Sequence, residues 1–445
     1  MKLSGWLLRT GLIVMIALSV VLTWLIWRNP SRLGHEQSQV TVTRRSGAKT
    51  TKSAGVVMAP TTAYYQQGGT KKLLFTPDEN VTTTIRARMR TWRLSTVTDG
   101  GKLTSSEYAA LLATDETLQL VYPDKMAYQT FNTSFFAKKA TATNANFTFD
   151  RLIVNLAKHR NTLTFVNDAT RTIHTGTLQA HALTKLNALV ADASATGFGV
   201  TEKRLHNGRQ VSDFTNAISV QPYVYLLDQQ SANHYVSLLM PTTTASAVDA
   251  RELGADTVYT AGTDYRLTLN TDTDVLQFDN ATAISSATGL ATNLTKSYAS
   301  LGKLDLLGLN AMRYYHYNKA TRKVTYRSYA QGLPIFNPHY YGRVTVATTT
   351  SGQQMFFSMN NLTVPIPTSQ GKVTLPSSEA VWQHLHGVGY HDDAIEDVVL
   401  GYYWQSQKEN SQVVELTPTY FVEIGGQYRR YTNWQGPDAD KQTQG

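Results

Sequence analysis

An uncharged, largely apolar stretch from Thr10 to Trp27 restricts the fold of this chain more than any other feature of its sequence. As an α-helix it spans about 27 Å, and the residues just before it extend this to the roughly 30 Å of a bilayer's hydrocarbon core. Trp6 lies near one end, and Trp24 and Trp27 lie at the other, where indole rings favour the headgroup boundary. We therefore expect residues 1–28 to form a transmembrane anchor with these tryptophans at its membrane interfaces.

A cleaved signal peptide is the alternative interpretation of this N-terminal segment. The apolar run is longer than the roughly 7 to 15 residues that are usual in a signal sequence. It ends in the sequence Leu25-Ile26-Trp27-Arg28-Asn29-Pro30, which offers no pair of small residues for cleavage. Both differences favour an anchor that stays attached to the rest of the chain.

The charges that flank the apolar run leave its orientation open. Lys2 and Arg9 precede it, whereas Arg28, Arg32 and several further basic residues follow it, with Glu36 as their acidic neighbour. A count of positive charges would place the C-terminal side in the cytoplasm. That count carries little weight before a long domain, because long domains are translocated largely regardless of charge.

One face of the anchor carries a stripe that could contact another membrane helix. Gly11, Met15, Ser19 and Thr23 recur at every fourth position, so they share one helix face. Small residues allow helices to approach closely in lipid, and we expect these four to form a transmembrane interface with a partner. The alternative is that the hydroxyl groups are simply tolerated within the membrane.

The composition favours a β-rich chain with several cores and no thiol chemistry. Hydrophobic residues make up 42% of the 445 residues, which is enough to bury sizeable cores, whereas charged residues make up only 16%. Tyrosine and threonine runs such as Thr348-Thr349-Thr350 favour strands. The absence of cysteine excludes disulfides, zinc ribbons, iron–sulfur clusters and thiol nucleophiles.

These patterns predict an α+β protein, in which a single transmembrane helix precedes a β-rich region of three domains. A polar, basic linker is expected at 29–60, because this segment has no hydrophobic periodicity. The predicted parts that follow are a mixed α/β domain at 61–184, a central α+β domain at 185–300, a β-rich C-terminal domain at 301–434 and a tail at 435–445.

Several local elements follow from capping and periodicity. Thr104 and Glu107 form a capping-box pattern at the start of a short helix, and a Ser-capped helix is expected over Ser377–His386. Helical spacing predicts further helices at 182–193 and 293–301. Strands are expected at 117–122, 312–317, 324–329, 343–347, 355–358 and 398–404, with a closing hairpin at 413–430 that turns at Gly425-Gly426.

One short pattern occurs twice. Residues 167–173 and 318–324 share the sequence Asn-x-Ala-Thr-Arg-x-(Ile/Val), each between strand-like segments. Asn is a turn former, because it can adopt positive φ and hydrogen-bond its own backbone. The pattern predicts two hairpins, which are compatible with a duplicated unit.

No motif indicates an active site, a cofactor site or a metal site. His384, His386 and His391 are close in sequence, but histidines two apart on a helix point in different directions. Residues 270–274 resemble the start of a calcium-binding loop, yet Val275 occupies the required glycine position, so a turn is expected. The net charge of +9 fits a membrane or an anionic polymer as well as nucleic acid. We predict no catalytic residue and no cofactor.

The exit of the anchor, Leu22-Thr23-Trp24-Leu25-Ile26-Trp27, resembles the first segment of the YycH family of Gram-positive bacteria. The stretch Thr325–Phe336, followed by Gly342-Arg343-Val344, resembles the same family and also the related YycI proteins, and Leu375-Pro376-Ser377 before a helix fits the pattern. The resemblance covers essentially the whole chain, although the middle cannot be matched residue by residue.

The resemblance implies a membrane accessory protein without enzymatic activity. It would act with YycI on the WalK sensor kinase of the WalRK two-component system, which controls cell-wall metabolism, partly through transmembrane contacts. It also implies a cytoplasmic N-terminus, an extracytoplasmic domain and a YycI-like C-terminal part. The alternative function is an extracytoplasmic sensor or binding protein for an anionic wall polymer or another ligand, and nucleic acid is not an expected partner.

Overall fold

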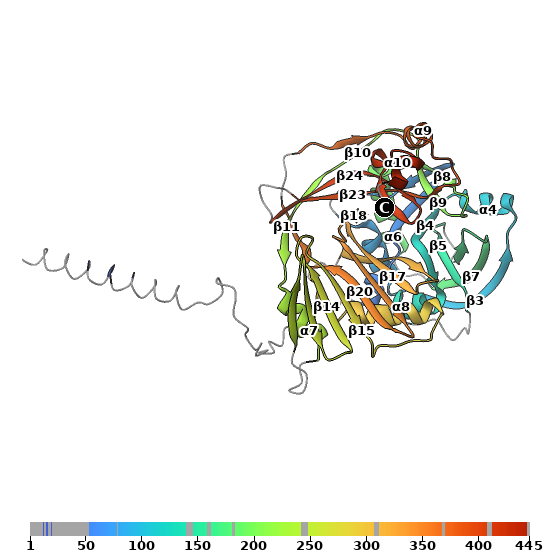
Figure 1. The fold of residues 1–445 in the computed structure, drawn as a ribbon. Helices are drawn as coiled ribbons and strands as arrows, with labels where there is room; N and C mark the ends of the chain where they lie inside the picture. The colour runs from blue at the N-terminus through green and yellow to red at the C-terminus, as the bar shows by residue number, and fades with distance from the viewer. Residues whose placement is uncertain are drawn as a thin grey trace, which may run out of the picture. The chain divides into compact units, whose positions relative to one another are not determined.

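The structure, a computed structural model, divides into two compact units, Met1–Gly47 and Ala48–Gly445 (Figure 1). It describes residues 12, 15, 16, 19, 53–77, 79–138, 146–157, 162–179, 183–241, 248–306, 311–366, 370–406 and 412–442. The first unit is described only at Leu12, Met15, Ile16 and Ser19, which are helical with exposed side chains. No helix among the described residues is long and apolar enough to cross a membrane, and most of the predicted anchor lies outside them.

A nine-stranded antiparallel sheet occupies the first half of the second unit. Its strands, in spatial order, are β3 (Arg93–Lys102), β7 (Thr172–Gln179), β6 (Thr162–Asn167), β5 (Thr148–Asn155), β4 (Thr117–Ala127), β1 (Thr62–Gln67), β2 (Thr70–Leu73), β8 (Phe198–Arg204) and β9 (Gln210–Phe214). Short turns join β1 to β2, β6 to β7 and β8 to β9, whereas helices lie between β2 and β3, β3 and β4, β4 and β5, and β7 and β8.

The two faces of this sheet bury different sets of side chains, because successive residues of a strand point to opposite faces. In β5, Leu152 and Val154 enter the main core, whereas Ile153 joins a small cluster with Tyr108 and Leu112. That cluster lies under α4 (Ser105–Leu112), which the predicted capping box of Thr104 and Glu107 opens. The main core is completed by α2 (Ala54–Val57), α3 (Val81–Met89), α5 (Tyr128–Ser134) and α6 (Leu183–Thr196).

A second sheet of 14 strands contains the C-terminal half of the chain. Its main path is β12 (Asp249–Leu253), β13 (Asp256–Ala261), β14 (Tyr265–Asn270), β15 (Val275–Asn280), β20 (Gly352–Ser358), β19 (Arg343–Thr349), β17 (Lys323–Ala330), β18 (Leu333–Phe336), β23 (Ile395–Ser406), β24 (Val413–Ile424), β11 (Tyr223–Gln229) and β21 (Asn360–Ile366). Two further strands branch from it: β16 (Met312–Asn318) pairs with β17, and β25 (Gln427–Arg430) pairs with β24.

Within this sheet, the pairing of β18 with β23 is parallel, and its other strand pairs are antiparallel. A small sheet pairs β10 (Ile218–Val220) with β22 (Val373–Leu375). The remaining elements are α7 (Ala232–Leu239), α8 (Leu290–Leu301), α9 (Ser378–Gly387), the 3₁₀ turn η2 (Tyr431–Asn433) and α10 (Pro437–Gln442). The strands and helices predicted from periodicity are confirmed, and β24 and β25 turn at Gly425 and Gly426, which both have positive φ.

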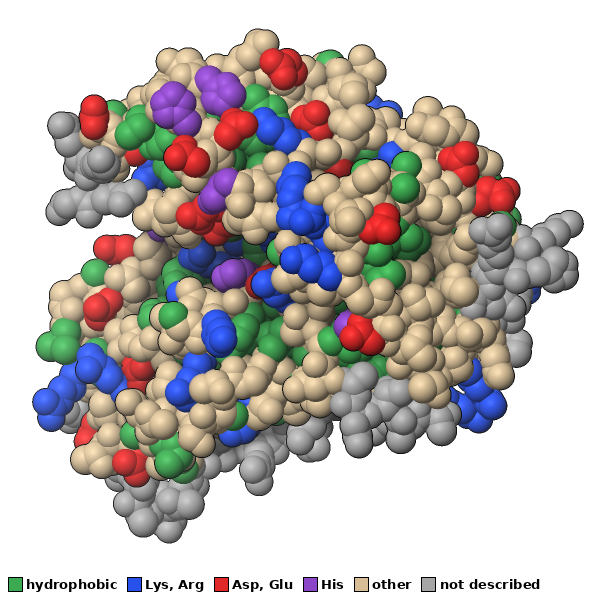
Figure 2. All heavy atoms as spheres, turned by 90° about the vertical axis from the view of Figure 1, so that its right-hand side faces the viewer, with side chains coloured by type: hydrophobic (Ala, Val, Ile, Leu, Met, Phe, Trp, Pro, Cys, Tyr) green, Lys and Arg blue, Asp and Glu red, His purple; other side chains and the backbone are tan. Residues whose placement is uncertain are grey.

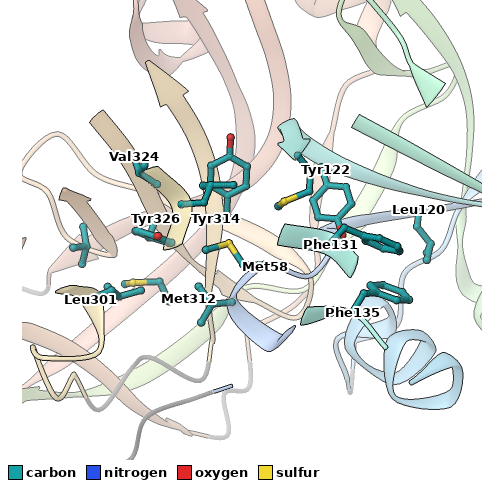
Figure 3. Close-up of a cluster of buried hydrophobic side chains, with 14 of the residues drawn as sticks. Met58, Leu120, Tyr122, Phe131, Phe135, Leu301, Met312, Tyr314, Val324 and Tyr326 are labelled. Atoms are coloured by element: carbon teal, nitrogen blue, oxygen red, sulfur yellow. The ribbon is translucent and has the colours of Figure 1, made fainter. Parts of the chain in front are cut away.

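The two large sheets share one hydrophobic core. Met58, Leu120 and Phe131 from the first half of the second unit belong to the same buried cluster as Met312 and Tyr326 from the second half. Figure 3 shows these side chains gathered between strands of both sheets. Apolar surface removed from water stabilises folding by about 25 cal/mol per Å², so each sheet depends on the other for part of its burial.

The repeated Asn-x-Ala-Thr-Arg pattern forms two hairpin turns, as predicted. The Asn167 side chain accepts a hydrogen bond from the Thr170 N–H at 3.1 Å, and Asn318 accepts one from Thr321 at 3.0 Å. The residue with positive φ is the arginine in each case, not the asparagine that the sequence suggested. The calcium-loop-like segment 270–274 turns in the same way, with a 3.1 Å bond from the Thr273 N–H to Asn270.

The helix α9 differs from prediction in how it begins. Ser377 is its N-cap residue by backbone conformation, but the Ser377 side chain makes no capping hydrogen bond. The hydroxyl of the next residue, Ser378, instead accepts a bond from the Phe214 N–H at 2.8 Å. Ser378 therefore ties α9 to β9 of the first sheet.

Sheet membership does not follow the predicted domain boundaries at 184 and 300. The strands β8 and β9, assigned to the central domain, belong to the first sheet, and β12 to β15 join the second sheet through β20. Packed residues also extend into the predicted linker and tail: Val57 is fully buried, and Asp440 is 5% exposed. The division into three independently folding domains stays a prediction.

Candidate functional site

Ion pairs and hydrogen bonds join the two large sheets beside their shared core. In the first of these contacts, Nδ1 of His316 on β16 lies 2.9 Å from the Asp124 carboxylate on β4. The Tyr317 N–H donates to the same carboxylate at 2.8 Å, and the Tyr314 hydroxyl donates to the Lys125 carbonyl at 3.0 Å. Burial opposes ionisation of Asp124, but the hydrogen bond and charge of His316 outweigh it and lower the Asp124 pKa.

A second contact lies where the turn between β8 and β9 meets β23 and β24. Nη1 of Arg209 is 3.1 Å from the Asp397 carboxylate and 4.0 Å from that of Glu423, and the Tyr428 hydroxyl donates to Asp397 at 2.8 Å. Burial raises the pKa of Glu423, and the neighbouring charge of Asp397 raises it further. The charge of one arginine thus offsets the charges of two carboxylates. We call the residues of these two contacts the junction: Asp124, His316, Arg209, Asp397, Glu423 and Tyr428.

A third polar cluster lies within the first sheet, on the face that carries α4. The Arg151 guanidinium is fully buried and donates to Asp168 at 2.8 Å and to Glu202 at 2.5 Å. A third donor of Arg151 reaches the Gln119 side chain at 2.8 Å, and Lys71 forms an ion pair with Glu202. Every charge in this cluster has an opposite charge beside it, which is the arrangement that makes burial of charges tolerable.

A surface depression of about 470 Å³ lies over the Arg151 cluster. Its lining includes the charged side chains of Lys71, Arg171, Glu202 and Arg204. Figure 2 shows one face of the molecule, on which a hollow has basic, acidic and His side chains around it. The depression over the Arg151 cluster has more basic than acidic side chains in its lining. Such an environment attracts anionic groups by its net positive charge, although Lys71 is already paired with Glu202.

The described part of the chain offers binding surfaces but no set of side chains arranged for catalysis by a metal. No group of three His, Asp or Glu side chains within it could hold a metal ion. His386 instead pairs with Asp392 at 2.8 Å, and the His384 ring packs edge-on against Tyr431. The carboxylates of the junction and of the Arg151 cluster are held by fixed partners, which suits structural and binding roles.

The predicted site residues of the anchor are described only in part. Met15 and Ser19 are helical and exposed, four residues apart, as one helix face requires. The other members of the proposed interface and of the aromatic belt lie outside the described residues: Gly11, Thr23, Trp6, Trp24 and Trp27. The partner interface therefore stays a prediction.

Sequence patterns indicate neither the junction nor the Arg151 cluster, because their members are far apart in the chain. Asp168 lies within the predicted hairpin turn at 167–173, but no pattern in the sequence indicates that Arg151 is its partner. One signal was present: Arg151 interrupts an apolar run in β5, where an unpaired charge would be costly. That signal predicts a buried partner without identifying it.

Comparison with known proteins agrees with this fold. A family model described as the YycH protein N-terminal domain matches residues 8–195, and one described as the YycH protein C-terminal domain matches residues 215–437. The crystal structure of YycH from Bacillus subtilis has a TM-score of 0.69 at 14% identity, covering 86% of this chain and 98% of that chain. No sequence among the curated proteins matches.

A further solved structure, an uncharacterized protein from Eubacterium rectale, has a TM-score of 0.29 at 7% identity over 50% of this chain and 86% of that chain. The likeness to the Bacillus subtilis structure shows a β-rich α+β fold. Proteins of the YycH family are known in general as regulators of the YycG/WalK kinase system, and they are accessory proteins rather than enzymes. Since the two family models together match most of its residues, this chain belongs to the YycH family.

Proposed function

We propose that this protein is a single-pass membrane accessory protein that modulates a WalK-like sensor kinase together with a YycI-like protein, and so controls cell-wall metabolism. The N-terminus lies in the cytoplasm and the large folded unit lies outside the cell membrane. The observation that carries the proposal is that the N-terminal family match starts at residue 8 and therefore includes the uncharged stretch Thr10–Trp27. The apolar segment is thus part of what the family model recognises.

The proposed action needs a difference in contact between two states of the kinase. A bound helix shifts a conformational equilibrium only if it packs better against one state than against the other. A preference of about 1.4 kcal/mol changes the ratio of the two states tenfold at 25 °C. Close packing along the stripe of Gly11, Met15, Ser19 and Thr23 is a physical means of supplying such a preference.

The folded unit supplies the second part of the proposal. Because its two sheets share a core and the ion pairs of the junction, the unit presents surfaces of fixed relative position to a YycI-like protein. In sequence, a basic segment that includes Arg44 and Arg45 connects the apolar run to that unit.

Enlarging the small residues of the stripe tests the transmembrane part. We expect Gly11→Leu combined with Ser19→Leu to weaken co-purification with the kinase and to change kinase output, while the folded unit keeps its thermal unfolding temperature. The matched control is Ala17→Leu combined with Val20→Leu, which adds bulk to the opposite helix face. Unchanged co-purification and output in the Gly11/Ser19 variant would remove the proposed contact.

Protease accessibility in intact protoplasts tests the orientation. We expect added protease to digest the folded unit without lysis and to leave a short N-terminal fragment in the membrane. Protection of the whole chain until lysis would reverse the proposed orientation. Release of a shortened protein into the medium would instead indicate a cleaved signal peptide.

A further inference from the structure

We propose that the second sheet holds a binding pocket for a small oxyanion, a phosphate or carboxylate group, centred on Arg343 and Trp404. The pocket is a cavity of about 120 Å³ lined by residues of β11, β17, β19, β21 and β23. These strands converge because β20 and β21, which are consecutive in the chain, pair with different neighbours. The pocket is separate from the junction and from the Arg151 cluster.

Arg343, the charged residue of the described lining, belongs to a row of arginines across three neighbouring strands. Arg313 on β16 lies opposite Arg327 on β17, and Arg327 lies opposite Arg343 on β19. Residues directly opposite each other point to the same face of a sheet, and like charges in such positions repel. The row therefore carries an electrostatic cost that an anion beside it would reduce.

Two members of the row are held by the protein itself. Arg313 donates to the Thr83 hydroxyl at 2.9 Å and to the Met312 carbonyl at 3.0 Å. Arg327 donates to the Ile335 carbonyl at 2.8 Å, and its guanidinium carbon lies 3.9 Å from the Phe336 ring centre. These contacts fix both side chains and use part of their donor capacity.

Arg343 differs, because its guanidinium makes no hydrogen bond or ion pair with any described residue. It stacks on Tyr340 with its guanidinium carbon 3.6 Å from the ring centre, and its buried Nε has no acceptor among the described residues. Burial lowers the pKa of Arg343 to about 10, and the neighbouring charge of Arg327 contributes. Arginine is the side chain best suited to bind a carboxylate or phosphate through two parallel hydrogen bonds.

A second residue of the lining, Trp404, also carries a donor without a described partner. Trp404 is 1% exposed, and its indole N–H is buried without an acceptor in the described part of the chain. A buried donor that lacks a partner costs about 1–3 kcal/mol. Buried indole N–H groups usually have a partner, so the pair of unused donors indicates that an acceptor binds here.

The rest of the lining selects an anion over a cation. Among the described residues that line the cavity, Arg343 is the charged one, and neither Asp nor Glu is present. The other polar residues of the described lining are uncharged: Tyr225, Ser328, Tyr329, Ser358, Asn360, Asn361 and Thr363. The volume is well below the roughly 300 Å³ or more of pockets for drug-sized ligands, so it suits one oxyanion group rather than a whole polymer repeat.

Calorimetric titration of the full-length protein in a nonionic detergent tests the proposal. Sodium phosphate and sodium acetate are titrated separately at constant ionic strength, to distinguish phosphate from carboxylate recognition. We expect saturable binding of at least one of them, weakened about tenfold or more by Arg343→Gln, as expected for loss of a charge-assisted hydrogen bond. Binding of phosphate alone assigns a phosphate ligand, and binding of acetate alone assigns a carboxylate.

Arg430→Gln is the matched control. Arg430 also stacks on a tyrosine, Tyr403 at 4.4 Å, and also has a buried Nε without a described acceptor, but it does not line the cavity. We expect Arg430→Gln to bind the anion as the wild type does. Equal weakening by both substitutions, or no saturable binding of either anion to the wild type, would overturn the proposal.

Two further variants keep the test valid if Arg343→Gln unfolds the protein. Trp404→Phe keeps an aromatic ring but removes the N–H, and we expect it to weaken binding while far-ultraviolet circular dichroism is unchanged. Arg343→Lys keeps the charge but loses the paired donors, and we expect affinity between those of the wild type and Arg343→Gln. Wild-type affinity in both of these variants would also overturn the proposal.

Discussion

Arg151 holds Asp168 through both Nε and Nη2, at distances of 2.8 to 3.1 Å, in a part of the first sheet where both side chains are buried. The two residues come from β5 and from the turn after β6, so the pair fixes the position of that hairpin turn on the sheet. Tyr108 donates to the same carboxylate at 2.8 Å and thereby attaches α4 to the pair.

Removing the charge of Arg151 should destabilise the fold strongly. In Arg151→Leu, the carboxylates of Asp168 and Glu202 stay buried without their main partner, and breaking a buried pair in this way costs about 3–5 kcal/mol. Urea unfolding followed by circular dichroism measures the change. Arg88→Leu is the control, because Arg88 is exposed on α3 and its loss should change stability by less than about 0.5 kcal/mol. Similar midpoints for the two variants would contradict this assignment.

Asp150 should make stability depend on pH in the neutral range. Burial and the nearby charge of Asp168 raise the Asp150 pKa to about 8. The folded state therefore binds a proton that the unfolded state releases near pH 4, so the free energy of unfolding should fall as the pH rises from about 4 to 8. We expect Asp150→Asn, which keeps an oxygen for the Asp168 N–H, to flatten this dependence and to be more stable than the wild type at pH 7. An unchanged pH profile would exclude Asp150 as its source.

The Asp124–His316 pair should couple the two sheets measurably. A double-mutant cycle with Asp124→Asn and His316→Ala should give a coupling free energy of about 0.5–3 kcal/mol, the range for residues in contact. The Asp124 pKa is lower in the folded state than in the unfolded state, where it is near 4. The pair therefore stabilises the fold when the pH is above the unfolded-state pKa of Asp124, and this stabilisation is lost as the pH falls through the folded-state pKa. Zero coupling at pH 6 would mean that the contact does not help to join the sheets.

Replacing either of two strand glycines, Gly401 and Gly199, by alanine should have opposite effects on the stability of the fold. A Cβ at Gly401 would lie 2.6 Å from the Pro334 carbonyl oxygen, where β18 and β23 pair, whereas a Cβ at Gly199 meets nothing within 4 Å. We expect Gly401→Ala to destabilise by about 1–3 kcal/mol through overpacking. Gly199→Ala should be neutral or stabilising by up to about 1 kcal/mol, because alanine reduces the entropy of the unfolded chain. Thermal unfolding of both variants makes the comparison.

Local sequence patterns predicted the caps and turns of this chain well. They did not predict which strands pair when the strands are far apart in the sequence. The capping box at Thr104 and the turns after Asn167 and Asn318 depend on residues close in sequence, and the structure contains each of them. The association of β18 with β23 was not predictable in the same way, because strand order depends on contacts between remote segments. The predicted boundary at 184 falls in the first turn of α6, and the strands after this helix, β8 and β9, return to the first sheet.

The candidate sites were also not predictable from local sequence patterns, because they form between segments that are far apart in the chain. Arg343 and Phe336 were noted only as members of a motif, and nothing in their spacing indicated a cavity or a row of arginines. The register of β16, β17 and β19 creates that row, and register is set by the pairing of whole strands. The junction likewise arises from side chains such as Arg209 and Asp397, which only the folded chain brings together.

The core shared by the two sheets has a consequence for dividing the protein into fragments. Residues 215–217 are exposed between β9 and β10, so the chain could be cut there without breaking either large sheet. Each piece would then carry apolar side chains, such as Phe131 in the first and Tyr326 in the second, whose packing partners lie on the other piece. When the pieces are produced separately, they should aggregate through this exposed apolar surface. When they are co-expressed, they should reassemble, because each piece covers the apolar surface of the other.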